Sequence, residues 1–410
     1  MFELDSTDKT DGSRERFVLL KLDQEPTASQ VPLDIVLDRA SLNRWIRVRQ
    51  TTLNDDQIAA ADGLRDRLRE YAMPVAVLAA ESLKEATESF KRINSSGKPM
   101  SDFHMVAALA FDSASDPRQQ FAEARAEYLA PIGWDAVSDS DVLGVCAGLA
   151  KQNPAKLDVD DLANNLRKDH ELIPRAFRVV AAAAELLRGC GVCGPEALPY
   201  AWQLITVAVF LGRTSALTPL GEVATAAVHR WFWLTTYGEV FAGGNSAVFD
   251  RSILALGKML EGGSHNAMER DVTRKVRPVG GFDFRSARSK ACALAMARYQ
   301  DRGQLDGPAH RGLATGVEAM QLLVARGQRS TWWHLAIVTP DHGVALLRNA
   351  LKRCAIGSAE VGDDDVLSWL GVEAGDTGQV VDLLAARRDR LLSAEKKFVC
   401  ELGLEWASGG

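Results

Sequence analysis

The sequence lacks a long apolar run. The longest stretch of this kind, residues 201–211 (AWQLITVAVFL), includes Gln203 and is well short of the ~20 apolar residues that a membrane-spanning helix needs. Residues 1–16 are polar and of mixed charge, without the apolar core of a secretion signal. We therefore expect a cytoplasmic protein with no membrane partner, in which residues 201–211 form a central buried helix.

Cysteine is scarce, with six residues in a chain of 410. That number and the expected cytoplasmic location argue against a disulfide framework. Cys190 and Cys193 are the only close pair, and a zinc ribbon would need a second pair at similar spacing. A lone CxxC is a weak signal, so we predict no metal site.

An excess of positive charge is also missing: 48 Lys and Arg face 54 Asp and Glu, for a formal net charge of -6. This balance argues against a coat of basic residues for nonspecific nucleic-acid binding, but it allows a local basic surface. Glu269, Asp271 and Asp283 interrupt the best candidate, so an ordinary solvated surface remains the alternative. The candidate DNA contacts are Arg270, Arg274, Lys275, Arg277, Arg285 and Arg288.

Familiar catalytic motifs are absent as well. The sequence contains no GxSxG, no GxxxxGK[ST] and no HExxH, and its seven histidines form no paired motif. His342, preceded by Asp341 and followed by Asn349, comes nearest to a nuclease-like group, although an ordinary turn before a helix is the favoured interpretation, because Asp and Pro are common turn formers. Residues 332–334 (WWH) could stack on bases, but their position before the apolar run 335–338 favours packing. We assign no catalytic residue.

What the sequence does have is regular apolar periodicity. Hydrophobic residues make up 47% of a chain long enough for two or three domains. We predict an α+β fold that is mostly α, with a small α/β part at residues 1–117, a helical domain at 118–262 and a mixed, mainly helical domain at 263–410. The expected strands are 17–22 and 73–78, and a turn followed by a short helix is expected at 32–49. The expected helices further along include 55–71, 142–150, 157–167, 176–187, 199–211, 220–236 and 380–402.

A sharp corner interrupts residues 81–111. The first half has the spacing of a buried helical face, and Asn94 and Gly97 suit a C-terminal cap and turn because both tolerate positive φ. Ser101 can then cap a second helix. The expected apolar side of that helix carries Phe103, Val106, Ala107, Ala110 and Phe111.

Residues 90–103 (FKRINSSGKPMSDF) resemble the FxxxN segment, typically FERINxGGxPLS, of the GmrSD-type restriction endonuclease N-terminal domain family. Residues 74–78, 230–233 (RWFW) and 385–398 are similar to further segments of that family. The resemblance implies a fold related to ParB and sulfiredoxin, nucleoside triphosphate hydrolysis, and restriction of modified phage DNA. It makes this chain a candidate antiphage, restriction-associated protein.

Two motifs of that family, QR and DGQQR, normally precede FxxxN and hold the phosphates and the metal. Neither occurs ahead of residue 90, and the single Gln-Arg pair lies at 328–329. The resemblance therefore implies an incomplete ParB/sulfiredoxin-like N-terminal part, which could use NTP and Mg only if an upstream segment or a partner chain supplies the missing motifs. The nucleotide-binding candidates that carry over are Phe90, Arg92, Asn94, Gly97 and Lys98.

The missing motifs leave enzymatic activity open. One hypothesis is a defence protein without NTPase or nuclease activity as an isolated chain. The alternative is a non-enzymatic helical adaptor or DNA-contacting scaffold, in which Asn94 serves only as a helix cap.

Overall fold

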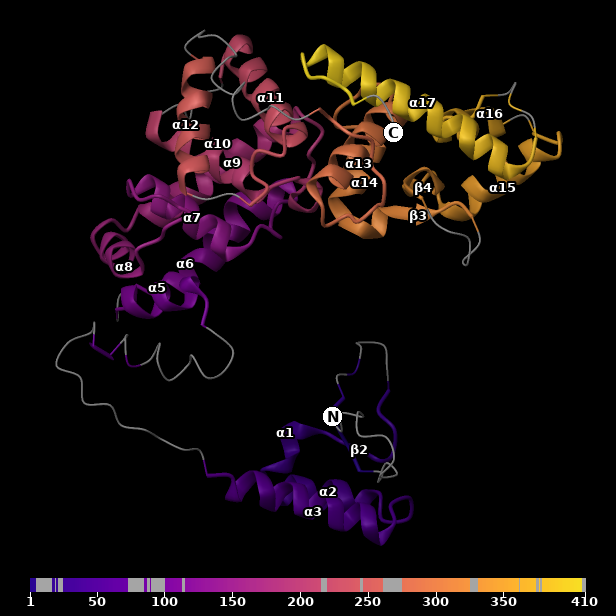
Figure 1. The fold of residues 1–410 in the computed structure, drawn as a ribbon. Helices are drawn as coiled ribbons and strands as arrows, with labels where there is room; N and C mark the ends of the chain where they lie inside the picture. The colour runs from indigo at the N-terminus through magenta and orange to yellow at the C-terminus, as the bar shows by residue number, and fades with distance from the viewer. Residues whose placement is uncertain are drawn as a thin grey trace. The chain divides into compact units, whose positions relative to one another are not determined.

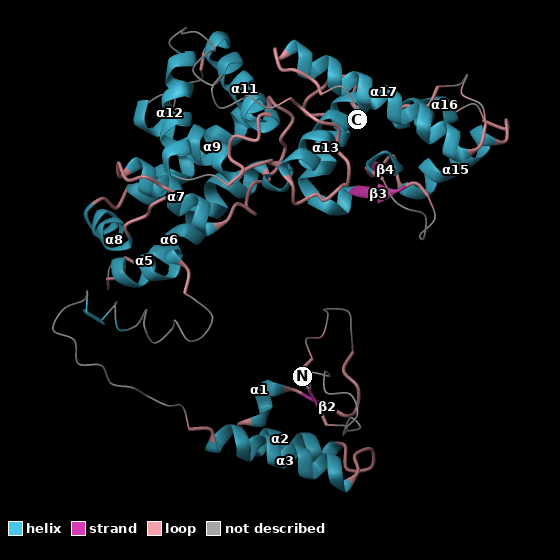
Figure 2. Ribbon diagram, viewed as in Figure 1, coloured by secondary structure: helices cyan, strands magenta, loops and turns pink. Residues whose placement is uncertain are grey.

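The computed structural model describes most of the chain and divides it into two compact units, residues 1–79 and 80–410 (Figure 1). Helices dominate the described residues, and the strands there form two small two-stranded antiparallel sheets (Figure 2). The mostly α prediction is therefore confirmed. The structure describes residues 1–4, 17–18, 20, 25–72, 85–86, 89, 100–112, 115–214, 220–243, 246–260, 275–324, 331–360, 362–373, 376 and 378–407.

The first unit packs three helices with a short sheet. Strand β1 (Phe2–Glu3) pairs with β2 (Gln30–Val31), and helices α1 (Leu33–Val36), α2 (Arg39–Val48) and α3 (Asp55–Glu70) follow. These helices confirm the predictions at 32–49 and 55–71. The unit has its own apolar core, made by Phe2, Leu4, Val31, Val36, Leu42, Trp45, Leu53, Ala61 and Leu64.

Side-chain caps begin two of these helices. The Asp38 carboxylate accepts from the backbone N–H groups of Ala40 and Ser41, and Asn54 forms a reciprocal capping box with Gln57. Such caps satisfy N–H groups that have no partner inside the helix.

Neither strand expected in this unit is seen in full. Within the predicted strand 17–22 only Phe17, Val18 and Leu20 are described, and Phe17 forms an isolated bridge with Phe2. The predicted strand 73–78 lies outside the described residues.

The second unit begins with a bundle centred on α10 (Ala201–Thr214), which packs against α7 (Asp139–Leu149), α9 (Leu172–Arg188) and α12 (Ser246–Leu260). The predicted central helix is thus confirmed. The elements before and around it are α5 (Asp102–Ala110), α6 (Pro117–Ala124), η1 (Arg125–Leu129), η2 (Ala130–Ile132), α7 (Asp139–Leu149), α8 (Val159–Lys168), α9 (Leu172–Arg188), η3 (Pro195–Ala197), α11 (Glu222–Tyr237) and α12 (Ser246–Leu260).

Gln203, the polar residue in the apolar run, is fully buried on α10. Its Nε2 donates to the Phe232 carbonyl at 3.0 Å and reaches the hydroxyls of Thr235 and Thr236 at 2.9 and 2.8 Å. These bonds tie α10 to α11. A buried amide is tolerated here because it has hydrogen-bond partners.

Helix α5 starts as predicted, because the Ser101 side chain accepts from the backbone N–H of His104. Phe103, Val106 and Ala110 are buried. Phe111 is 58% exposed, so its predicted place in the apolar side was wrong: the helix ends at Ala110 and the backbone of Phe111 is extended.

Helix α5 packs against α8 in the second unit. The domain boundaries after residues 117 and 262 stay predictions.

The remaining elements surround α13 (Ala287–Gln300) and α17 (Val380–Glu401), which pack against each other. Strand β3 (Met320–Leu322) pairs antiparallel with β4 (Leu335–Ile337), and the preceding Trp332 is buried, as the packing interpretation predicted. The other elements are α14 (Pro308–Gly312), η5 (Leu313–Ala319), η6 (Trp332–His334), α15 (Val344–Ala355) and α16 (Asp363–Leu370).

An ion pair joins α15 to α16 and predicts a pH dependence. Arg353 Nε donates to Asp363 Oδ2 at 2.7 Å, and the hydrogen bond from Arg353 is the main cause that lowers the pKa of Asp363 to about 2. A lowered carboxyl pKa stabilises the fold above the ordinary value, about 3.9, and this contribution is lost as the pH falls through the folded value.

We therefore expect Asp363→Asn to lower the melting temperature at pH 7, with a difference from the native protein that shrinks between about pH 4 and pH 2. Asp364→Asn, an exposed change in the same helical turn, is the control. Melting curves from pH 7 to pH 2 test this, and a difference that stays constant over that range would contradict it.

Candidate nucleic-acid interface

The nucleotide-binding candidates Phe90, Arg92, Asn94, Gly97 and Lys98 lie outside the described residues, so their roles stay predictions. The described part of the chain holds no group of three or more His, Cys, Asp or Glu side chains that could bind a metal ion.

The CxxC cysteines lie in the core. Cys190 and Cys193 are buried free thiols, and burial raises both pKa values, that of Cys193 to about 11. Metal ligation and nucleophilic attack both use the thiolate. At neutral pH both thiols therefore stay protonated, which favours a packing role over metal ligation or nucleophilic attack.

His342 lies in a turn and against an aromatic ring. Thr339 Oγ1 accepts from the His342 backbone N–H at 3.1 Å, and the imidazole stacks on Trp369 with ring centroids 4.1 Å apart and nearly parallel planes. Burial lowers the pKa of His342. The hydrogen bond is typical of a turn before a helix, and the ring contact is a packing contact with α16.

Four of the six candidate DNA contacts are described, and three of these four form ion pairs. Lys275 Nζ lies 3.0 Å from Glu405 Oε2, and Arg285 Nη2 lies 3.0 Å from Asp283 Oδ2. Both pairs are largely exposed, and exposed pairs of this kind contribute little stability. Arg270 and Arg274 lie outside the described residues.

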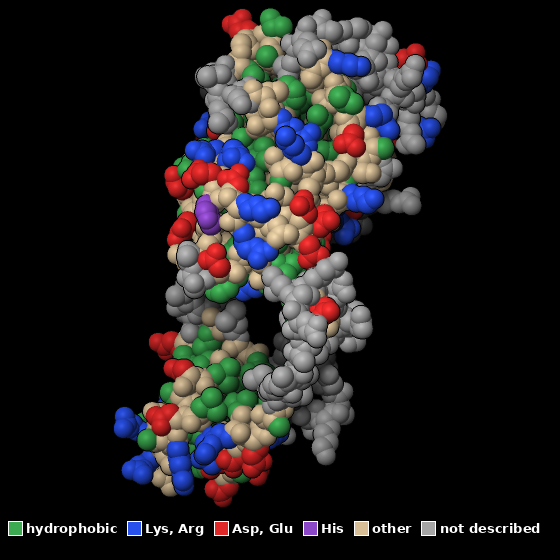
Figure 3. Space-filling model, turned by 90° about the vertical axis from the view of Figure 1, so that its left-hand side faces the viewer, with side chains coloured by type: hydrophobic (Ala, Val, Ile, Leu, Met, Phe, Trp, Pro, Cys, Tyr) green, Lys and Arg blue, Asp and Glu red, His purple; other side chains and the backbone are tan. Residues whose placement is uncertain are grey.

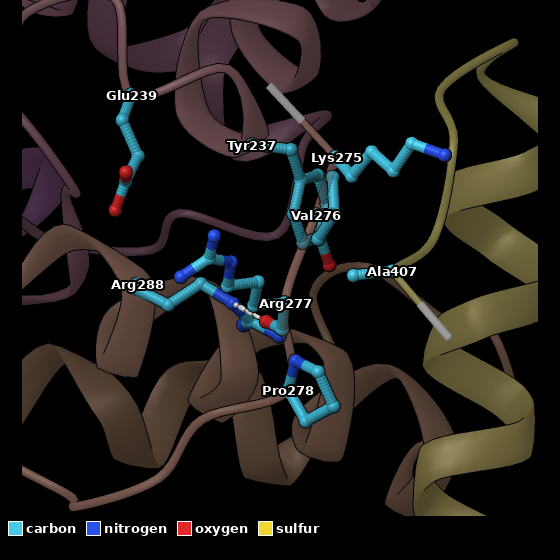
Figure 4. Close-up of a pocket in the computed structure, with 8 residues that line it drawn as sticks. All are labelled: Tyr237, Glu239, Lys275, Val276, Arg277, Pro278, Arg288 and Ala407. Carbon is cyan, nitrogen blue, oxygen red and sulfur yellow. Dashed lines mark hydrogen bonds between the residues drawn. The ribbon is translucent and has the colours of Figure 1, made fainter. Parts of the chain in front are cut away.

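Three of the candidates meet in one pocket of about 440 Å³: Lys275, Arg277 and Arg288. Figure 4 shows the two arginine side chains together in the pocket, with the Lys275 side chain extending away from them. The other lining residues are Tyr237, Glu239, Val276, Pro278 and Ala407.

Backbone contacts hold the basic segment in place. Val276 N–H donates to the Glu405 carbonyl at 2.8 Å, and Ala407 N–H donates to the Val276 carbonyl at 2.9 Å. These bonds fix residues 275–277 against the end of the chain. They leave the side chains of Lys275 and Arg277 on the exposed side.

Arg288 lies in the first turn of α13, where Ser286 caps the helix by accepting from the Ser289 N–H at 3.2 Å. Its two terminal nitrogens donate to both oxygens of Glu395 at 2.8 and 3.1 Å, and its Nε donates to the Arg277 carbonyl at 2.8 Å (Figure 4). The guanidinium is thus fixed in a bidentate ion pair, the geometry that gives Arg–carboxylate pairs their strength.

Glu395 is buried, at 4% exposure, and Tyr237 is a second hydrogen-bond donor to its carboxylate. The Tyr237 hydroxyl donates to Glu395 Oε1 at 3.2 Å, and burial, together with the Glu395 charge, raises the pKa of Tyr237 well above its usual range. Tyr237 therefore stays a neutral hydrogen-bond donor at neutral pH.

Arg277 differs from its neighbours. Within the part of the chain that the structure describes, its guanidinium has no carboxylate within ion-pair distance, although it lies in the same pocket as two paired cations. An exposed arginine without an acid can contact an anion from outside, since its five N–H donors match phosphate oxygens.

Sequence reasoning missed Glu395, because the long helix 380–402 reads as charged. The signal was present: Leu384, Arg387, Leu391, Glu395 and Val399 follow each other at steps of three and four, so two charges lie on the apolar face.

Charge on the surface is mixed. Figure 3 shows Lys/Arg and Asp/Glu side chains interspersed over the face that it presents, without a broad basic area among the described residues there.

The RWFW segment at 230–233, which is similar to a segment of the GmrSD-type family, consists mainly of residues that pack in the core. Trp231, Phe232 and Trp233 are buried, and Arg230 Nη2 donates to the Leu402 carbonyl at 3.2 Å.

None of the helices in the described part of the chain combines the length and apolar character that a membrane crossing needs. Comparison with family models, curated proteins and solved structures gave no match.

Proposed function

We propose that this chain is a restriction-associated defence protein of the GmrSD N-terminal type that contacts DNA and has no NTPase or nuclease activity as an isolated chain. The FxxxN-like segment at 90–103 and the absence of QR and DGQQR ahead of it support this reading. Its N-terminal part corresponds to an incomplete ParB/sulfiredoxin-like domain, which would need another segment or chain for NTP and Mg.

The observation that carries the DNA contact is the guanidinium of Arg277, which has no carboxylate partner among the described residues and lies beside Lys275 and Arg288. A phosphate can bind Arg277 without breaking an ion pair of the described residues. It can also replace the exposed Glu405 carboxylate as the partner of Lys275. Arg288 is held by buried Glu395 and so serves to shape the pocket. These cation–phosphate contacts suit the sugar–phosphate backbone of DNA and do not distinguish one base sequence from another.

We expect Arg277→Gln to weaken binding to duplex DNA roughly five- to tenfold at 0.1 M salt and to reduce the slope of log K against log salt by about 1, because one phosphate contact is lost. Fluorescence anisotropy over a salt series measures both quantities. Lys168→Gln removes an exposed charge from α8 and is the matched control.

Equal slopes for the native protein and Arg277→Gln would contradict the DNA contact at this pocket. If the native protein binds no DNA at low salt, the chain acts instead as a helical adaptor that assembles with other proteins.

A further inference from the structure

A second pocket lies between α13 and α17, with a volume of about 360 Å³. The last turns of both helices and the residues just after α13 line it. Two aromatic rings, Tyr299 and Phe398, contribute its apolar part. Its charged lining residues are Arg298, Arg302, Glu395, Lys397 and Glu401.

Glu395 does not neutralise the cations of this pocket. Both of its oxygens accept from Arg288, and one also accepts from the Tyr237 hydroxyl, on the side of the first pocket. The second pocket is therefore left with three cations and Glu401 as the remaining acid of its lining.

The three cations lack acidic partners in the described part of the chain, where Arg298, Arg302 and Lys397 form no ion pair. Arg302 donates to the Ser368 hydroxyl at 3.3 Å. Arg298 is half-buried, with its guanidinium carbon 4.4 Å from the centre of the Phe398 ring. Packing against the ring fixes the plane of a guanidinium and leaves its N–H edges for hydrogen bonds.

We propose that this pocket binds a small polyanion that carries a phosphate or polyphosphate group. Arg298 and Arg302 supply the planar donors that match phosphate oxygens, and Lys397 adds a point charge. A volume of about 360 Å³ is in the range of small-molecule sites. This binding does not depend on DNA contact at Arg277.

Cations near helix C-termini also stabilise the helix dipole, a role that needs no ligand. The two roles differ in what a substitution changes. Loss of a dipole contact lowers the melting temperature alone, whereas loss of a ligand contact lowers affinity.

The test is calorimetric titration of the full chain with inorganic pyrophosphate at low ionic strength. We expect saturable binding, weakened about tenfold by Lys397→Gln and strengthened severalfold by Glu401→Gln, which removes the acid of the lining. Lys396→Gln is the matched control, because it removes the same charge from the neighbouring exposed residue, which does not line the pocket. Melting curves establish that each variant is folded.

Three results would overturn the site: no saturable binding by the native protein, equal weakening by Lys396→Gln and Lys397→Gln, or a lower melting temperature for Lys397→Gln with unchanged affinity. Arg277→Gln separates this proposal from the DNA contact. It should weaken DNA binding and leave pyrophosphate binding unchanged.

Discussion

Glu395→Leu is expected to lower the free energy of unfolding by about 3–5 kcal/mol, because it leaves Arg288 as an uncompensated charge in a buried setting. The Arg288 side chain is 15% exposed and that of Glu395 is 3% exposed, so water cannot fully replace the lost carboxylate. The Tyr237 hydroxyl also loses its acceptor. Urea unfolding at pH 7 measures the effect.

Glu401→Gln, on an exposed position of the same helix, should change stability by less than about 0.5 kcal/mol. The double variant Arg288→Met, Glu395→Leu removes both charges, and we expect its loss to be well below the sum of the two single losses. Additive losses would show that the pair contributes only packing, contrary to the geometry of two hydrogen bonds.

Gly191→Ala should be similarly damaging, at about 3 kcal/mol or more. The φ of Gly191 is +88°, where an L side chain is strained by roughly 1–2 kcal/mol. An added Cβ would also lie 2.4 Å from His310 Cδ2 and 2.6 Å from its Nε2, and such overpacking costs about 1–3 kcal/mol.

His310 cannot move aside, because its Nδ1 bonds to Asp301 Oδ2 at 2.7 Å, and the same carboxylate accepts from the N–H groups of Ala309 and His310 at 3.0 Å each. Gly133→Ala is the control: its φ is +73°, but no atom of the described residues lies within 4 Å of the added Cβ, so it should cost only about 1–2 kcal/mol. Equal losses for the two variants would refute the steric part of the argument.

Periodicity alone predicted most of the helices. Apolar residues that repeat every three to four positions bury one face of a helix, and Ser101, the capping residue expected from the sequence, is the N-cap of α5. The same reasoning identified the central α10, since a nearly continuous apolar run must be buried on all sides.

The short strands escaped prediction because two- or three-residue segments carry no periodic signal. Strand β3 exists only because β4 lies opposite, with Met320 paired to Ile337. Leu68 of α3 is 42% exposed, because the core of the first unit covers only the part of that helix that carries Ala61 and Leu64.

The sequence by itself determined the helical class, the absence of familiar catalytic motifs and the candidate basic residues, because these follow from composition and local spacing. Tertiary structure alone decided which charges are paired. Lys275, Arg277 and Arg288 read alike in the sequence, but Glu395, more than 100 positions away from Arg288, neutralises that arginine and leaves Arg277 without an acid among the described residues. Electrostatic pairing depends on distances of a few ångströms, and only the packing of α17 against α13 brings that carboxylate into place.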